Sequence, residues 1–214
     1  GDSVANKISE IMPGLIKDNS KDNSKGDTEA ILYKSFEDAE KYVDSDIQID
    51  DKSTGSTALV AHILPDQIYI ANLGDCRAIV GNSKSGKLRS VTMDHKPDLP
   101  EETKRIIAGG GFVSSGNSFD VPRVMGILAV SRSFGDNNLY PHISHIPDIY
   151  SFDPKKYNML IMACDGVWDV LDNDQVVAIA SRCPTAIQAA ERIRDTALEN
   201  NTTDNVSVVV VFLK

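Results

Sequence analysis

The chain has 214 residues, which is long enough to bury a full core, and we expect one domain spanning residues 1–214. Its formal net charge is −9, with 31 acidic against 22 basic residues. This balance argues against nucleic acid and anionic membranes as partners, because both select for clustered Lys and Arg. No apolar run of about eighteen residues and no basic-then-apolar N-terminus occurs, so we expect neither a membrane span nor a signal peptide.

The three cysteines, Cys76, Cys164 and Cys183, are widely spaced along the chain. They show neither the CxxC pairs of a zinc site nor the density of a disulfide-rich secreted scaffold. We therefore expect free thiols in a soluble protein of a reducing compartment, the cytoplasm or the nucleus.

Apolar residues at helical spacing predict two helices near the N-terminus. The apolar face of the first helix consists of Val4, Ile8, Met12 and Leu15. Pro13 is expected to bend or end this helix. A duplicated polar tetrapeptide follows and predicts a polar loop insertion over residues 17–27. The second helix is predicted over residues 28–43.

After Gly55 the apolar period shortens from about four residues to about two, which predicts short β-strands. Three strands at 57–64, 67–73 and 77–80 are expected to form an antiparallel meander. The elements predicted after it are a helix at 100–108, strands at 112–114, 149–152 and 159–163, helices at 175–181 and 184–200, and a fully buried strand at 206–213. This order predicts an α+β fold in which helices cover packed sheets.

Two aspartates lie next to predicted core strands. Asp165 lies two residues after the end of the strand at 159–163. Asp204 lies two residues before the start of the apolar run at 206–213. Neighbouring strands could bring both carboxylates to one sheet edge, where they repel each other unless a cation lies between them. A hard divalent metal ion suits such oxygen ligands. Aspartates beside strands are also common turn formers, so both interpretations stay open at this point.

The run Asp172-Asn173-Asp174 could suggest a calcium loop, but the glycine and the distal glutamate of such a loop are absent. We interpret Asp172 as the N-cap of the following helix. Asp75 after Gly74 and Asp136 after Gly135 are turn candidates.

A series of local strings resembles successive motifs of the protein phosphatase 2C family, in the same order and with similar spacing. These strings are Gly55-Ser-Thr-Ala58, Asn72-Leu-Gly-Asp-Cys-Arg-Ala78, Asp94-His-Lys-Pro97, Arg105 with Gly109-Gly110, Arg123-Val-Met-Gly-Ile-Leu-Ala-Val-Ser-Arg132 with Phe134-Gly-Asp136, Ala163-Cys-Asp-Gly-Val-Trp-Asp-Val170 and Thr203-Asp-Asn205. The string around Asp165 is the most diagnostic of them.

The resemblance implies a two-sheet antiparallel β-sandwich flanked by helices, with a binuclear Mn²⁺ or Mg²⁺ centre. Asp165 and Asp204 match the family's ligands in that centre. Asp94 and Asp169 match positions that, together with Asp165, hold a weaker third metal in several members. The implied reaction is hydrolysis of phosphoserine or phosphothreonine in a phosphorylated protein substrate, by attack of a metal-activated water and without a phosphoenzyme.

The resemblance also assigns residues outside the metal site. Residues 112–122 look like the family's flap, in which we expect Phe112 and Phe119 to be packing residues. Arg77 and Arg132 do not match the family's phosphate-binding arginine. We expect each of them to pair with a nearby carboxylate such as Asp75 or Asp136.

The family's first metal-binding motif, Asp-Gly-His-Gly-Gly, does not occur in the sequence, although Gly1-Asp-Ser-Val-Ala5 resembles what directly follows it. We therefore expect a catalytically incomplete fragment that lacks the first strands of the fold, is inactive alone, and contains no catalytic side chain beyond metal ligands. The missing segment could then be a partner as a separate chain. Two alternatives stay open: a naturally short pseudophosphatase that binds proteins, and a calcium-stabilised β-sandwich module. The presence of both Asp165 and Asp204 favours the fragment over the pseudophosphatase.

Overall fold

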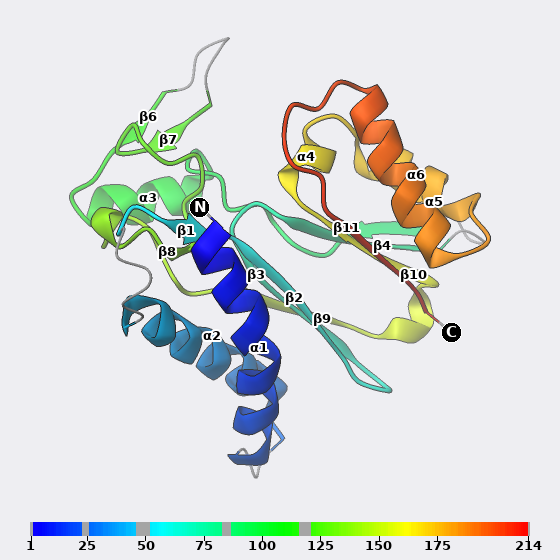
Figure 1. Cartoon of the computed structure of the whole chain (residues 1–214), viewed down its shortest axis with the longest axis horizontal. Helices are drawn as coiled ribbons and strands as arrows, with labels where there is room; N and C mark the ends of the chain where they lie inside the picture. The colour runs from blue at the N-terminus through cyan, green and yellow to red at the C-terminus, as the bar shows by residue number, and fades with distance from the viewer. Residues whose placement is uncertain (1, 23–25, 46–51, 83–86, 116–120, 214) are drawn as a thin grey trace. The chain divides into compact units, whose positions relative to one another are not determined.

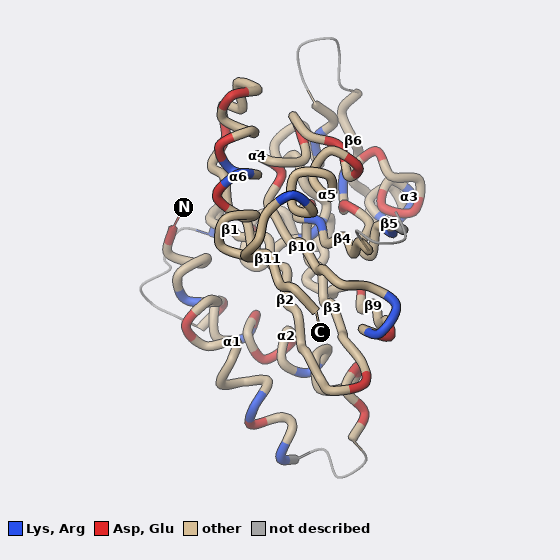
Figure 2. The backbone as a smooth tube through the Cα atoms, turned by 90° about the vertical axis from the view of Figure 1, so that its right-hand side faces the viewer, with Lys and Arg blue, Asp and Glu red and all other residues tan. Residues whose placement is uncertain are grey.

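The computed structural model describes residues 2–22, 26–45, 52–82, 87–115 and 121–213 (Figure 1). They form two compact units, the first from residues 1–58 with 95–149 and the second from residues 59–94 with 150–214. In the described part of the chain, no helix combines the length and the apolar character needed to cross a bilayer. Acidic and basic residues are interspersed along both α1 and α6 (Figure 2).

The second unit is built on two sheets. One sheet has the strand order β11-β10-β4-β5 and is antiparallel throughout, with β4 at Arg77–Asn82, β5 at Lys87–Ser90, β10 at Met159–Ala163 and β11 at Val208–Phe212. The other has the order β2-β3-β9, with β2 at Ala58–Ile63, β3 at Ile68–Leu73 and β9 at Asp148–Phe152. The helical elements of this unit are η2 at Pro154–Lys156, α4 at Asp165–Trp168, α5 at Asn173–Ser181 and α6 at Ala186–Glu199.

The four-stranded sheet of this unit is buried on both faces, because successive side chains of a strand point to opposite sides. Leu160 of β10 packs with Ile70 of β3 and Val80 of β4 in the core between the two sheets. The next residue, Ile161, packs with Ile193 in the cluster under α5 and α6, which cover the other face (Figure 1). Two antiparallel sheets with covering helices confirm the predicted fold class.

Two strand predictions for the second unit are wrong. The strands β2, β3 and β4 do not form a meander, because the chain leaves one sheet after β3 and enters the other with β4. The turn between them contains Gly74 with φ +115°, a conformation that favours glycine. The last strand, β11, is not fully buried. It pairs only with β10 among the described strands, and Val209 exposes 55% of its surface.

The first unit contains two long helices and several short strands. The helices are α1 at Asp2–Asp22, α2 at Thr28–Ser45 and α3 at Pro100–Ala108, with a short helix η1 at Asn137–Leu139. Two antiparallel pairs join β1 (Gly55–Ser56) to β8 (Phe134–Gly135) and β6 (Val113–Ser114) to β7 (Arg123–Val124). Ile106 of α3, Val124 and Ile143 form a small buried cluster.

The first helix corrects two sequence predictions. It continues through Pro13 as far as Asp22, so neither an end at Pro13 nor a loop over residues 17–22 is found. Met12 and Ile16 are buried on either side of the proline, and this burial outweighs the lost hydrogen bond. The Asn19 amide also donates to Ser35 Oγ of α2 at 3.1 Å. The rest of the predicted loop includes residues 23–25, which lie outside the described residues.

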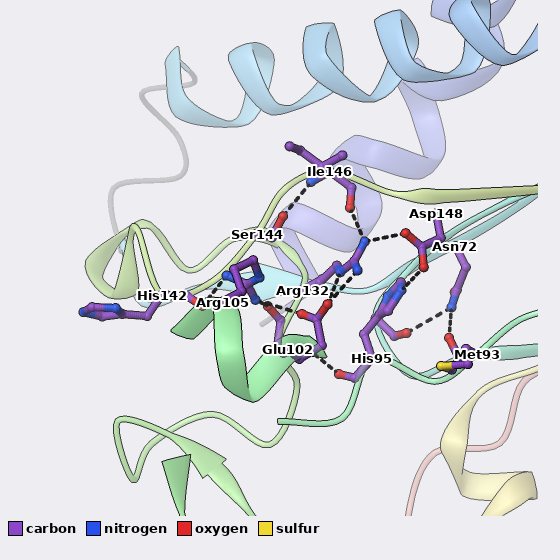
Figure 3. Close-up of polar contacts among 12 residues, drawn as sticks. Asn72, Met93, His95, Glu102, Arg105, Arg132, His142, Ser144, Ile146 and Asp148 are labelled. Atoms are coloured by element: carbon purple, nitrogen blue, oxygen red, sulfur yellow. Dashed lines mark hydrogen bonds and ion pairs between the residues drawn. The ribbon is translucent and has the colours of Figure 1, made fainter. Parts of the chain in front are cut away.

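A buried carboxylate, Glu102 of α3, organises the polar interior of the first unit (Figure 3). Its side chain is 2% exposed and accepts hydrogen bonds from Arg132 Nη2 at 2.6 Å and Arg105 Nη2 at 2.8 Å. Burial by itself raises the pKa of Glu102. The hydrogen bonds and charges of the two arginines outweigh it and lower this pKa from 4.5 to about 2.

The same network continues from Arg132 to Asp148 and His95. Arg132 Nη1 donates to Asp148 Oδ1 at 2.7 Å, and Asp148 Oδ2 lies 3.1 Å from His95 Nε2. The contacts with His95 and then Arg132 hold the pKa of Asp148 well below its usual range. Arg132 therefore pairs with Glu102 and Asp148, as the expected structural role requires, but not with Asp136. Asp136 instead accepts a hydrogen bond from Ser133 Oγ at 2.6 Å.

We predict that Glu102→Ala lowers the free energy of unfolding by about 3–5 kcal/mol, because it leaves two partly buried guanidinium groups without their shared carboxylate. Denaturant unfolding measures this loss. Glu37→Ala is the matched control, since Glu37 pairs with Lys34 and Lys41 on the exposed face of α2. It should leave the free energy of unfolding nearly unchanged, because exposed ion pairs contribute little to stability. Equal losses in the two variants would contradict the role given to Glu102.

The depressed pKa of Glu102 also predicts a pH dependence of stability. The folded state holds this pKa at about 2 and the unfolded state near 4.5, so the contribution of the ionised group is present above pH 4.5 and is lost as pH falls towards 2. Unfolding free energies measured across this interval should fall more steeply for the unmodified protein than for Glu102→Gln. Parallel curves would show that Glu102 does not titrate as described.

Candidate metal site

The pairing of β10 with β11 brings the segments that contain Asp165 and Asp204 to the same end of the sheet. The pairing runs from Met159 opposite Phe212 to Ala163 opposite Val208. One step further, the Cys164 N–H donates to the Ser207 carbonyl oxygen at 3.2 Å. The chain therefore leaves β10 at Asp165 where the segment after Asp204 enters β11.

Gly166 lets these two segments touch. A Cβ atom at Gly166 would lie 2.2 Å from the Asn205 carbonyl oxygen and 3.4 Å from Asp204 Cβ. The first distance is far below a van der Waals contact, so any side chain here would push the segments apart. Cys164 Sγ adds a hydrogen bond to the same Asn205 oxygen at 3.1 Å. The backbones that carry Asp165 and Asp204 are thus direct neighbours.

The two carboxylates make similar local contacts. Asp165 is half-buried at the first residue of α4, and its Oδ1 accepts the Gly166 N–H at 3.0 Å. Asp204 is exposed, and its Oδ1 accepts the Asn205 N–H at 2.7 Å. Each bond joins the aspartate to the N–H of the next residue, and Asp165 lies at the start of a helix. Local bonds of this kind use one oxygen of a carboxylate that has about four lone-pair positions, so they do not prevent it from binding a metal.

Asp94, a predicted ligand of the third metal, is held by Arg77. The Arg77 guanidinium donates from Nε to Asp94 Oδ1 at 3.0 Å and from Nη2 to Asp94 Oδ2 at 2.7 Å. Its Nη1 donates to Asn173 Oδ1 at 2.9 Å, and its Cζ lies 5.1 Å from the centre of the Trp168 ring. Arg77 thus pairs with a carboxylate as expected, but that carboxylate is Asp94 and not Asp75.

Asp169 is exposed at the C-terminal end of α4, where its N–H donates to the Asp165 carbonyl oxygen at 2.8 Å. Across the ranges that the structure describes, no three His, Cys, Asp or Glu side chains converge as a metal-ligand set. The four predicted ligands therefore divide into two groups. Asp165 and Asp204 lie on neighbouring backbone segments, and carboxylate oxygens are the kind of ligand that Mn²⁺ or Mg²⁺ prefers. Asp94 forms an ion pair with Arg77, and Asp169 belongs to no set of three converging ligands among the described residues.

Other residues singled out by the sequence are also placed. Asp172 forms a capping box with Gln175 at the start of α5, which confirms the predicted N-cap. The predicted flap begins with β6 and ends next to β7, but Phe119 lies outside the described residues. Phe112 exposes 52% of its surface, which does not support the expected packing role.

Comparison with known proteins identifies the family. The family model described as Protein phosphatase 2C matches residues 1–206, which is nearly the whole chain. The chain belongs to the protein phosphatase 2C family. The probable protein phosphatase 2C 24 of Arabidopsis thaliana is 39% identical over 179 residues, which are 76% of this chain and 48% of that protein. The probable protein phosphatase 2C 17 of the same plant is 37% identical over 86% of this chain and 65% of its own length. The chain thus spans about half to two thirds of these relatives.

Solved structures of other proteins share the fold of this chain. A structure titled as a C. elegans sex determining protein has a TM-score of 0.87 at 26% identity, over 97% of this chain and 52% of that chain. The serine-threonine phosphatase 2C from Toxoplasma gondii has a TM-score of 0.84 at 24% identity, over 100% of this chain and 82% of its own. The second likeness, at this identity, shows the fold alone.

Sequence reasoning missed the two contacts that define this site. Nothing in the sequence connects Arg77, the first residue of β4, with Asp94, which lies 17 residues further along the chain, beyond β5. The contact of Gly166 with Asn205 was also missed. The structure requires a glycine at position 166 because of Asn205, which lies 39 residues further along the chain. The sequence signal that could have indicated this contact is the presence of two apolar runs, which pair as antiparallel strands β10 and β11.

We predict that Gly166→Ala lowers the free energy of unfolding by about 1–3 kcal/mol, because the new methyl group collides with a backbone oxygen and not with a flexible side chain. Thermal or denaturant unfolding measures the loss. Gly14→Ala in α1 is the matched control, because nothing lies within 4 Å of its Cβ position and alanine favours the helix. A Gly166→Ala protein as stable as the control would show that the close contact does not exist.

Proposed function

We propose that the whole protein hydrolyses phosphoserine and phosphothreonine in protein substrates, with Mn²⁺ or Mg²⁺ ions held in part by Asp165 and Asp204. Membership of the protein phosphatase 2C family supports this activity. The single observation that carries the assignment of the two residues is the contact of Gly166 with Asn205, which makes their backbones neighbours. Carboxylates on these two neighbouring segments would supply negative charge that a divalent cation neutralises.

The surrounding residues explain how this site would stay in place. Asp165 follows β10, whose side chains are buried on both faces, so its backbone is held by the core of the second unit. Trp168 is buried, and its indole N–H donates to the Ala163 carbonyl oxygen at 2.9 Å, which ties α4 to the end of β10. A bound divalent cation would lower the pKa of a water molecule and neutralise phosphoryl oxygens. The surrounding protein residues would hold the two carboxylates in position for such a cation.

The proposal extends to the organisation and setting of the chain. The family model covers residues of both compact units, so we propose that the two units belong to one catalytic domain, with residues 112–122 as its flap. Among the described residues, the backbones of Asp165 and Asp204 are neighbours but no set of three ligands converges, so we expect them to bind metal weakly and to be inactive by themselves. The three cysteines form no disulfide, which suits the cytoplasm or the nucleus.

We predict that Asp165→Asn and Asp204→Asn each abolish Mn²⁺-dependent hydrolysis of a phosphoserine or phosphothreonine peptide by the whole protein, while the fold is retained. Both changes keep the size and the turn-forming acceptor of the side chain but remove a charge that a cation needs. Release of inorganic phosphate measures the activity. Asp66→Asn is the control, since Asp66 is exposed and pairs with Lys155. Full activity in either of the first two variants would refute the assigned role.

A further inference from the structure

A largely apolar groove of the first unit lies between α2 and residues 145–147, and the proposed function does not use it. Its volume is about 750 Å³. One wall of this α2 groove is a single stripe of the helix, which runs from Ala30 past Tyr33 to Lys41. From Ala30 to Lys41 the helix rises by about 16 Å, at about 1.5 Å per residue. The α2 groove is therefore long enough to take about three turns of a second helix.

The other wall of the α2 groove presents an exposed isoleucine in a fixed position (Figure 3). Ile146 exposes 64% of its surface. Its N–H donates to Ser144 Oγ at 3.2 Å, and its carbonyl oxygen accepts a hydrogen bond from Arg132 Nη1 at 3.0 Å. Pro147 follows and restricts the backbone of Ile146 to extended conformations. Because Arg132 is itself bound to the buried Glu102, Ile146 is held ready for contact, and little entropy is lost in ordering it on binding.

The lysines of the α2 wall are paired with carboxylates of the same helix. Lys34 Nζ lies 3.3 Å from Glu37 Oε2 and 2.8 Å from Asp38 Oδ1, and Lys41 pairs with the same two acids. The two positive and two negative charges compensate each other. The α2 groove therefore offers an incoming group mainly carbon surface, and the group that fills it should be apolar.

The surroundings of the α2 groove are acidic. The helix α2 has five acidic and two basic residues, which gives it a formal net charge of −3, and the whole chain has −9. Glu29 is exposed directly before Ala30, at one end of the α2 groove. A partner with basic residues beside its apolar face complements this charge. An anionic membrane surface, by contrast, would be repelled.

We propose that the α2 groove binds a basic amphipathic helix of a partner protein, with the apolar face of that helix against Tyr33 and Ile146. Binding of such a helix in an apolar groove is a recurrent mode of recognition, in which residues at every third or fourth position fill the groove. Tyr33 exposes 42% of its surface, and tyrosine is among the residues that contribute most to protein interfaces. The inference uses no residue of the candidate metal site, so it does not depend on the proposed hydrolysis.

The test measures binding of the whole protein to a fluorescent amphipathic peptide of leucine and lysine, by fluorescence polarisation. The leucines recur at every third or fourth position, so that they form one face of a helix. A scrambled peptide of the same composition is the matched probe, because it has the same charge but no apolar face. The amphipathic peptide should bind at least about tenfold more tightly, since only it can bury its leucines together. Equal binding of both peptides would show attraction by charge alone and would overturn the proposal.

Variants of the two walls locate the binding. Ile146→Ser should weaken binding of the amphipathic peptide by about tenfold, because apolar contact area is lost. Tyr33→Ser tests the α2 wall in the same way and serves if the first variant fails to fold. Glu29→Lys should reduce both the affinity and its dependence on salt. Ile187→Ser is the matched control, since Ile187 is 72% exposed on α6 in the second unit. Wild-type affinity in folded Ile146→Ser and Tyr33→Ser proteins would refute the assignment of the groove.

Two further measurements distinguish a partner protein from other occupants of the α2 groove. Vesicles of phosphatidylcholine and phosphatidylserine should not sediment the whole protein, and sedimentation velocity should show no self-association that Ile146→Ser removes. Both expectations follow from the negative charge of α2, which repels an anionic surface and a second copy of the same helix. Vesicle binding or self-association that is lost in Ile146→Ser would assign the groove to lipid or to a second copy and would overturn the proposal.

Discussion

The close contact between Gly166 and the Asn205 carbonyl oxygen is the constraint on which the candidate site depends. It exists because β10 and β11 pair in a register that extends one step beyond the strands, through the hydrogen bond from Cys164 to Ser207. A shift of that register by one residue would turn every side chain of β11 to the opposite face. It would also move Asp204 away from Asp165. The position of both aspartates therefore follows from the packing of the core strands.

The core of the second unit makes this register costly to change. Side chains of β10 alternate between the cluster shared with β3 and β4 and the cluster under α5 and α6. A slipped strand would place residues suited to one cluster into the other, at the cost of packing on both faces. Burial thus fixes the backbone at Asp165, and the candidate site uses this rigidity. In the first unit, by contrast, the ion network around Glu102 performs the corresponding structural role with charges.

Local signals were sufficient to predict part of this structure. The strand β10 was predicted with its observed bounds, because a short apolar run that is followed closely by a glycine is a clear strand signal. The helix α3 was predicted equally well, because Pro100 favours its first turn and the glycines after Ala108 disfavour its continuation. The capping box of Asp172 and Gln175 is also a short-range pattern. In these cases the interactions that decide the structure lie within a few residues.

The predictions that failed depend on partners far away in the sequence. Residues 17–22 form the last turns of α1 because Ile16 is buried and Asn19 contacts α2. The polar composition of residues 17–22 does not reveal these contacts. The exposure of β11 depends on its place at the edge of the described sheet, and a continuous apolar run alone cannot show this. Arg132 was expected to pair with a nearby carboxylate such as Asp136, but its carboxylate partners are Glu102 on α3 and Asp148. Which charged residues pair with each other is decided by the folded structure and not by their spacing in the sequence.

The most direct test of this account is a crystal structure of the whole protein grown with Mn²⁺, with the metal located by its anomalous scattering. The account predicts a Mn²⁺ ion bound by carboxylate oxygens of both Asp165 and Asp204, at oxygen distances of about 2.1 Å. Anomalous peaks that lie elsewhere, with these two side chains facing different surfaces, would contradict the central claim.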